Sequence, residues 1–211
     1  MGLKQPNLTE LQDPEKYLLI RTIAHQDMLP FIQEQFQKRN FIIHLFVLFN
    51  LALLTAASSM SIHQVLAEEY PFWKMLIWSL VGAILGSTLI IPVHEAIHGL
   101  TYYFLGAKKV KYGWNPKQFY FFAVADRFIV NKVDIWPLAL APFFLITGLG
   151  IFGIYHVQGA WQWLLWGFVC MHSLNCIGDF GILSFFWDFR KHSIYTFDLV
   201  KDSVSFIYLK K

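Results

Sequence analysis

Long stretches without charge are the feature that most limits what this chain can fold into. No Asp, Glu, Lys or Arg occurs from Phe41 to Met60, from Met75 to Val93, or from Ile135 to Gly178. A helix needs about 20 apolar residues to cross about 30 Å of hydrocarbon, and these runs are long enough. Only 15% of the 211 residues are charged, against about 25% in soluble domains. The sequence therefore predicts an all-α polytopic membrane protein.

We expect four membrane helices, over residues 41–60, 73–105, 134–156 and 160–187. Lys and Arg are abundant in segment 1–40, in the loop 106–133 and after residue 187, and absent from loops 61–73 and 157–160. Positive residues remain on the cytoplasmic side. This alternation predicts a multi-pass protein of the cell membrane with both termini and the long loop in the cytoplasm.

The chain divides into a cytosolic amphipathic segment (1–40), a membrane domain (41–187) and a cytosolic tail (188–211). Apolar residues recur at helical spacing in the first segment, which predicts a helix either on the membrane surface or packed on the protein; they are Ile20, Ile23, Met28, Phe31, Ile32 and Phe36. Strand-like residues flank the predicted turn 115–118 and favour a hairpin. The tail has strand-like composition too.

The second predicted span contains the sequence His94-Glu95-Ala96-Ile97-His98. On a helix, histidines four residues apart lie about 40° apart in azimuth and about 6 Å apart along the axis, so both can face one metal ion. Two imidazoles suit Zn²⁺, and Glu95 beside them can act as a general base. The alternative is a purely structural polar cluster at the membrane interface, hydrogen-bonded to neighbouring helices. Ionisable residues are costly at this depth, which favours the metal site.

A catalytic zinc site needs a third protein ligand, and Asp179 is the one further acid well inside a predicted span. From Met75 to His94 the helix would rise about 28 Å, and from Trp161 to Asp179 about 27 Å in the same direction. The two positions should therefore lie at nearly equal depth. We expect His94, His98 and Asp179 to bind the metal near the cytoplasmic end of the spans.

Two more polar residues accompany Asp179 on the fourth predicted span. His172, Asn175 and Asp179 fall within about 60° of azimuth, so we expect them to share one face of that helix. Asn175 could orient a substrate carbonyl or stabilise an oxyanion, or it could form an interhelical hydrogen bond. His172 is too far along the axis to be a favoured ligand, so we expect it to support the site or to be structural. Ser173 and Cys176 should point elsewhere.

The sequence HEAIHGL, followed by Leu-Ala-Pro on the next span and HSLNCIGD on the last, resembles a bacterial family of putative zincin peptidases, a domain of unknown function. More distantly, the layout resembles the site-2 proteases, intramembrane metalloproteases with HExxH on one helix and an Asp ligand two spans later. The resemblance implies that His94, His98 and Asp179 bind zinc and that Glu95 is the base. Site-2 proteases usually carry a proline between the Asn and the Asp, whereas none lies between Asn175 and Asp179.

These features favour a Zn²⁺-dependent peptidase that cleaves a peptide or membrane-protein substrate near the cytoplasmic face of the lipid bilayer. The loop hairpin could hold an extended substrate as an edge strand. A non-proteolytic zinc-binding scaffold, sensor or transport component would use the same ligands, and an enzyme acting on a lipid is a third possibility. The net charge of +3 gives no indication of nucleic-acid binding.

Overall fold

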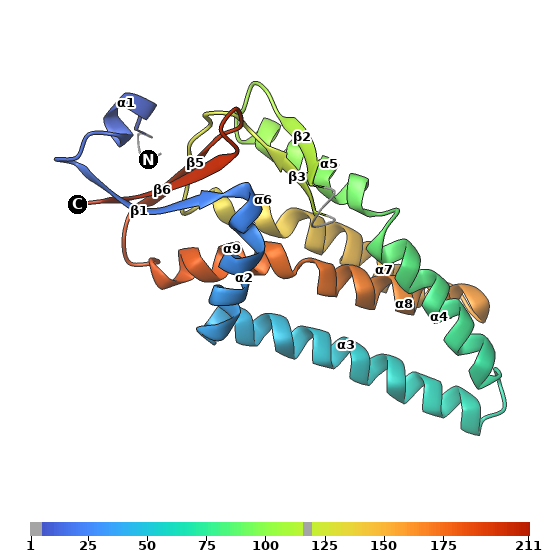
Figure 1. The fold of residues 1–211 in the computed structure, drawn as a ribbon. Coiled ribbons are helices and arrows are strands. Elements are labelled where there is room, and N and C mark those ends of the chain that lie inside the picture. Colours follow the sequence, from blue (N-terminus) through green and yellow to red (C-terminus); the bar gives the residue numbers. More distant parts are fainter. Residues whose placement is uncertain (1–5, 116–119) are drawn as a thin grey trace.

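The computed structural model describes residues 6–115 and 120–211, with helices gathered at one end and two small sheets at the other (Figure 1). The helices are α1 (Leu8–Leu11), α2 (Met28–Gln37), α3 (Phe41–Leu66), α4 (Phe72–Ser87), α5 (Ile91–Phe104), α6 (Ile135–Pro142), α7 (Gly148–Ile154), α8 (Ala160–Asn175) and α9 (Ile177–Asp188). A 3₁₀ turn (His25–Asp27) precedes α2, and a π-helical segment (Phe143–Thr147) joins α6 to α7.

The strands in the described part of the chain form two antiparallel sheets. They are β1 (Tyr17–Ala24), β2 (Lys111–Asn115), β3 (Tyr120–Val124), β4 (Val130–Asn131), β5 (Ile194–Leu199) and β6 (Val204–Lys210). One sheet has the order β1-β6-β5-β4, and β2 and β3 form a separate hairpin. The prediction of strands in the loop and in the tail is therefore confirmed, although the expected turn lies largely outside the described residues.

The helix expected in the N-terminal segment is confirmed for Met28, Phe31, Ile32 and Phe36, which lie on α2, and wrong for the part that forms β1. Ile20 and Ile23, which we expected on a helix, lie on β1, which pairs with β6 from Tyr17↔Lys210 to Ala24↔Val204. The apolar spacing predicted one helix where there are two elements, because only a 3₁₀ turn separates β1 from α2. The helical period was therefore read across a boundary between two kinds of structure.

Helix α2 packs against α9. The rings of Phe31 and Phe185 lie 5.5 Å apart, and a Cβ at Gly181 would lie 2.5 Å from Cδ1 of Ile32. Arg21 on β1 donates to Glu34 on α2 at 2.5 Å. Burial raises the pKa of the Glu34 carboxyl, but Arg21 and Lys38 outweigh it and lower that pKa overall. These contacts fix the N-terminal segment over the C-terminal half of the last long helix.

Within residues 6–115 and 120–211, three helical stretches are long and apolar enough to cross a membrane, and α4 with α5 makes a fourth if that bent pair is one span. The three are Phe41–Leu66, Ile135–Ile154 and Ala160–Asp188. Much of α3 faces outward with apolar side chains, such as Leu48 at 64% exposure, as expected of a helix in contact with lipid. The structure is consistent with a membrane protein, while the orientation of the spans stays a prediction.

Two of the predicted spans are interrupted where the sequence suggested continuous helix. Helices α4 and α5 meet at a bend of 42°, with residues 88–90 between them. Pro92 lies in the first turn of α5 and not in the middle of a helix. A proline is tolerated in the first turn because no backbone hydrogen bond is lost there. Helix α8 ends at Asn175, and Cys176, with ψ near 8°, separates it from α9.

The core beneath these breaks is aromatic. Phe180, the residue after Asp179, packs against Phe46 of α3 at 4.7 Å and Phe143 at 5.1 Å between ring centroids. All three side chains are at most 5% exposed. Helices α3 and α9 and the π-helical segment therefore pack together next to Asp179.

Candidate metal centre

The two helix breaks position the metal-ligand candidates. Helix α5 starts anew after residues 88–90 and carries His94 and His98 one turn apart. Helix α9 starts anew after Cys176, and Asp179 lies in its first turn. The N-terminus of a helix favours a negative charge, so the break stabilises a carboxylate at a depth where carboxylates are costly.

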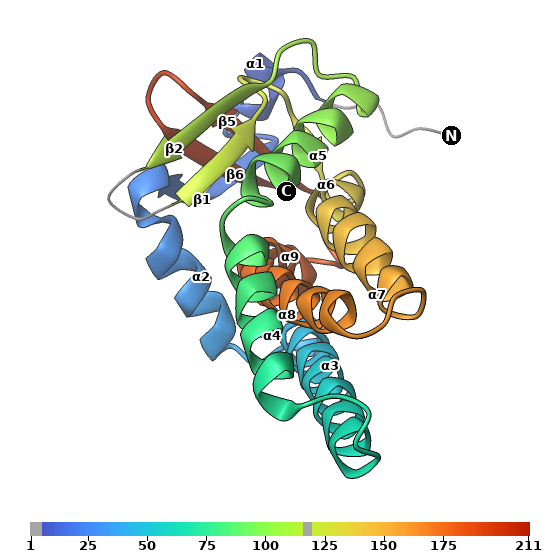
Figure 2. The same ribbon diagram turned by 90° about the vertical axis from the view of Figure 1, so that its right-hand side faces the viewer.

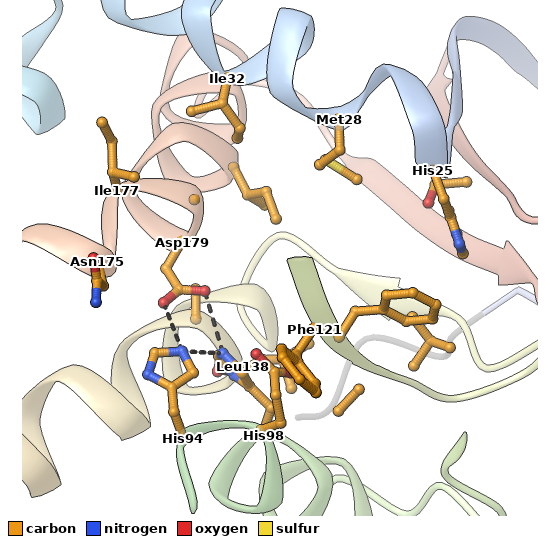
Figure 3. A pocket seen from close by; sticks show the side chains of 18 of the residues that line it. His25, Met28, Ile32, His94, His98, Phe121, Leu138, Asn175, Ile177 and Asp179 are labelled. Carbon is orange, nitrogen blue, oxygen red and sulfur yellow. Dashed lines mark hydrogen bonds and ion pairs between the residues drawn. The ribbon is translucent and has the colours of Figure 1, made fainter. Parts of the chain in front are cut away.

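His94, His98 and Asp179 converge on one point (Figure 3). The Nε2 atoms of the two histidines are 3.0 Å apart. Asp179 offers one oxygen to each ring, with Oδ2 3.3 Å from His94 Nε2 and Oδ1 3.2 Å from His98 Nε2. Zinc bonds of about 2.0–2.1 Å in a tetrahedron place neighbouring ligand atoms about 3.3–3.4 Å apart. The observed spacing is close to that of three corners of such a site.

The second ring nitrogen of each histidine explains why the first one points inward. His98 Nδ1 lies 2.8 Å from the carbonyl oxygen of Leu138 on α6, so Nδ1–H donates and Nε2 keeps its lone pair for the centre. His94 Nδ1 lies 3.3 Å from His172 Nε2. Lone pairs of two nitrogens and a carboxylate at this spacing repel one another unless a proton or a metal cation lies between them. The donor set therefore fits a divalent metal such as Zn²⁺.

His172 is the next link in a chain of polar contacts behind His94. Its side chain is 1% exposed, and its Nδ1 lies 3.1 Å from Oγ1 of Thr147, which is also buried. With Nδ1–H donating to Thr147, Nε2 of His172 can accept from His94 Nδ1–H. A ligand histidine is commonly oriented in this way. His172 therefore lies where a residue supporting His94 would lie.

Glu95 borders the same centre. A carboxylate oxygen of Glu95 lies within 4.8 Å of the ligand nitrogens of His94 and His98. A backbone hydrogen bond from Ala123 on β3 reaches the Glu95 carboxylate. The β2–β3 hairpin approaches α5 closely because Gly99 has no side chain, since a Cβ there would lie 1.9 Å from Oη of Tyr112. The hairpin therefore helps to hold the carboxylate next to the histidines.

Asn175 makes an interhelical hydrogen bond, one of its two predicted roles. Its Nδ2 donates to the carbonyl oxygen of Gly86 on α4 at 3.2 Å. The shared face predicted for His172, Asn175 and Asp179 assumed an unbroken helix, and the interruption at Cys176 removes that assumption. The bond joins the ends of α4 and α8, where both spans break.

Sequence reasoning missed several groups around the centre. The Cys176 thiol, expected to point elsewhere, lies 4.0 Å from His172 Nε2 and in one cluster of ligand atoms with His94 and His172. Thr147 is the single hydroxyl in the charge-free run of α6 and α7, and that isolation is a signal that could have found it. The backbone groups of Leu138 and Ala123 carry no side-chain signal at all.

A cavity of about 480 Å³ opens from the centre, within the 300–1,000 Å³ typical of ligand pockets. Residues of α2, α5, α9, β3 and the larger sheet line it, and Figure 3 shows part of this lining. Figure 2 shows how α2, α5 and α9 are arranged beside the strands. Its walls include both candidate histidine ligands, Glu95, Asp179, and apolar side chains such as Met28 and Phe121. A molecule bound there would lie directly against the candidate ligands.

Apolar helices enclose the two histidines of an HExxH sequence and a carboxylate, an arrangement consistent with a membrane protein that carries a metal site. The comparison with known families agrees, because a family described as putative zincin peptidase matches residues 87–194, just over half of the chain. The chain belongs to that family, whose description indicates a zinc metallopeptidase. Neither the curated proteins nor the solved structures include a match, so the likeness to site-2 proteases stays a prediction.

Proposed function

We propose that this protein is a zinc-dependent membrane peptidase in which His94, His98 and Asp179 hold Zn²⁺ and Glu95 acts as general base. One observation carries the proposal: the ligand atoms of these three residues lie 3.0–3.3 Å from one another at the wall of a cavity. The family description supports the same class of enzyme. The HExxH spacing supports the assignment of the base.

Zn²⁺, when bound, would lower the pKa of a water molecule and polarise a carbonyl group. Glu95 then accepts the proton from the attacking water and can return it to the leaving amine. The hydrogen bond from Ala123 restrains its carboxylate for this task. His172, backed by Thr147, keeps the His94 lone pair directed at the centre.

The substrate must be extended where it is cleaved, because a helix hides its carbonyl groups in internal hydrogen bonds. Strand β3 pairs with β2 along one edge, and Ala123 on its other edge contacts Glu95. We infer that an extended peptide adds to this outer edge next to Ala123, by strand addition. By the distribution of Lys and Arg, the site would lie near the cytoplasmic face of the bilayer.

The test compares wild type with Glu95→Gln in detergent-purified, zinc-loaded protein. Both are given a peptide library of defined sequences, and cleavage is read by mass spectrometry beside the zinc content of each sample. We expect equal zinc and a loss of cleavage of about 10²–10⁴-fold in Glu95→Gln. The matched control is Asp126→Asn, because Asp126 is an exposed carboxylate outside the cavity.

Cleavage by Glu95→Gln at the wild-type rate would contradict the assignment of the base. Zinc in the wild type without cleavage of any peptide would favour the non-proteolytic alternative. The same proteins incubated with phospholipid and glycerolipid mixtures test for hydrolysis of a lipid ester, which would identify the third class of function instead.

A further inference from the structure

The cavity has a second polar end, remote from the candidate metal centre. Besides the metal-centre residues, its walls include His25 from the 3₁₀ turn, Asp198 from β5 and Ser205 from β6. Figure 3 shows His25 on the opposite side of the pocket from His94 and Asp179, with Met28 and Phe121 between them. Polar groups therefore gather at two ends of one cavity, and apolar side chains separate them.

The second end is built around the carboxylate of Asp198. Asp198 faces Ser205 directly across the β5–β6 ladder, and the Ser205 hydroxyl donates to Oδ1 of Asp198 in a short hydrogen bond. His25 Nε2 lies 3.9 Å from the same oxygen, beyond hydrogen-bonding distance. The side chains of His25 and Asp198 are only 11% and 16% exposed. The cluster is therefore largely shielded from solvent.

The charge of Asp198 is incompletely compensated by the part of the chain that the structure describes. Both contacts given above use Oδ1, which leaves Oδ2 without a partner among the described residues. No Lys or Arg is among the described residues that line the cavity. A sheltered carboxylate gains most from a cationic partner, and one hydroxyl with a distant imidazole does not supply it.

We propose that His25, Asp198 and Ser205 form a specificity subsite that binds a basic side chain of the substrate. The aliphatic part of a Lys or Arg side chain would lie along the apolar middle of the cavity, with its cationic end at Oδ2 of Asp198. The cavity links this subsite to the residues assigned to hydrolysis. The identification of the ligand as a peptide rests on the proposed function, whereas the preference for a cation rests on the cluster itself.

Binding to the Glu95→Gln protein tests the subsite without cleavage. Three fluorescent 12-residue peptides are compared that differ only at a central position, occupied by Lys, norleucine or Glu. Norleucine keeps the aliphatic chain of Lys and lacks its ammonium group. We expect the Lys peptide to bind about tenfold more tightly than the norleucine peptide, as measured by fluorescence anisotropy.

Variants at Asp198 in the Glu95→Gln background decide whether this carboxylate causes the preference for the Lys peptide. Asp198→Asn should abolish the preference for Lys, and Asp198→Lys should shift it toward the Glu peptide. Asp126→Asn is the matched control, because Asp126 pairs with the same stretch of β5 yet does not line the cavity. Asp126→Asn should keep the preference. Ser205→Ala leaves the carboxylate in place and should keep the preference too. If Asp198→Asn fails to fold, Asp198→Lys decides, because a preference for Lys that survives this change would overturn the subsite.

Equal binding of the Lys and norleucine peptides would overturn the subsite, as would a preference for Lys that survives Asp198→Asn. If Asp198→Asn lowers the thermal stability but leaves the peptide preference unchanged, the cluster only joins strands, and the subsite is overturned as well. The outcome is separable from that of the proposed function. A Lys preference without cleavage by zinc-loaded wild type would reject the peptidase and keep the subsite, whereas cleavage without that preference would reject the subsite alone.

Discussion

The helix pairs α4/α5 and α8/α9 differ sharply on the two sides of their breaks. Before the breaks, α4 and α8 cross in close backbone contact. A Cβ atom added at Gly82 would lie 1.8 Å from the carbonyl oxygen of Leu164. A Cβ atom added at Gly167 would lie 1.8 Å from the carbonyl oxygen of Ser79. After the breaks, α5 and α9 meet through the side chains of His94, His98 and Asp179, and a cavity opens beside them.

The difference separates anchoring from chemistry within the same two spans. Small residues let membrane helices pack closely, so the α4–α8 crossing is rigid and leaves no room for a ligand. The breaks then create new helix starts whose first turns can carry polar side chains inside an apolar layer. We infer that the close crossing fixes the positions of the metal-ligand candidates, while the breaks give them space and access to water.

The largest effect is expected from filling the close crossing. Gly167→Ala would place a methyl group against the Ser79 carbonyl, which is backbone and cannot rotate away, so the variant should lose about 3 kcal/mol of stability. Gly148→Ala on α7 is the matched control, because its Cβ would meet nothing within 4 Å. It should be neutral or slightly stabilising. Unfolding in detergent measures both, and equal stability of the two variants would disprove the close contact.

A smaller effect is expected at the metal centre when His172 is changed. His172→Ala removes the acceptor for His94 Nδ1–H and should weaken zinc binding about 10–100-fold, while Glu95 and the three ligands remain. His172→Gln keeps an acceptor and should recover part of that loss. The control is His156→Ala, because His156 is exposed and bonds only locally, to the carbonyl oxygen of Phe152 at the end of α7. Zinc competition with a chromophoric chelator measures the affinities, and wild-type affinity in His172→Ala would refute the supporting role.

The smallest effect is expected at the junction between the two regions. Asn175→Ala removes the hydrogen bond to the Gly86 carbonyl and should cost about 0.6–1 kcal/mol of stability. Thermal unfolding and peptide cleavage are measured together. A large loss of cleavage with unchanged stability would contradict the junction role and restore the oxyanion role that the sequence also allowed.

The candidate ligand set could be predicted from the sequence because each member is a rare ionisable residue in an apolar run. His94, Glu95 and His98 share the spacing of one helix turn, and counting residues along two spans brought Asp179 to the depth of His94. The structure brings His94 Nε2 within 3.3 Å of Asp179. Composition and local periodicity were sufficient for these positions.

The rest depended on information that local patterns do not carry. The break at Cys176 has no proline or strong helix-breaking pair to announce it, and the hydrogen bonds from His98 to Leu138 and from Ala123 to Glu95 use backbone groups. The pairing of β1 with β6 joins residues almost 200 positions apart. Such contacts are decided by tertiary packing, which also places His25 and Asp198 in the same cavity as the candidate metal centre.

The zinc content of detergent-purified protein tests the central claim most directly. It is measured by mass spectrometry of the metal in wild type, His94→Ala, Asp179→Ala and the control His156→Ala, each loaded with zinc and then dialysed. We predict about one zinc per chain in wild type and in His156→Ala, and loss of that zinc in His94→Ala and Asp179→Ala. No zinc in the loaded wild type, or full zinc in Asp179→Ala, would contradict it.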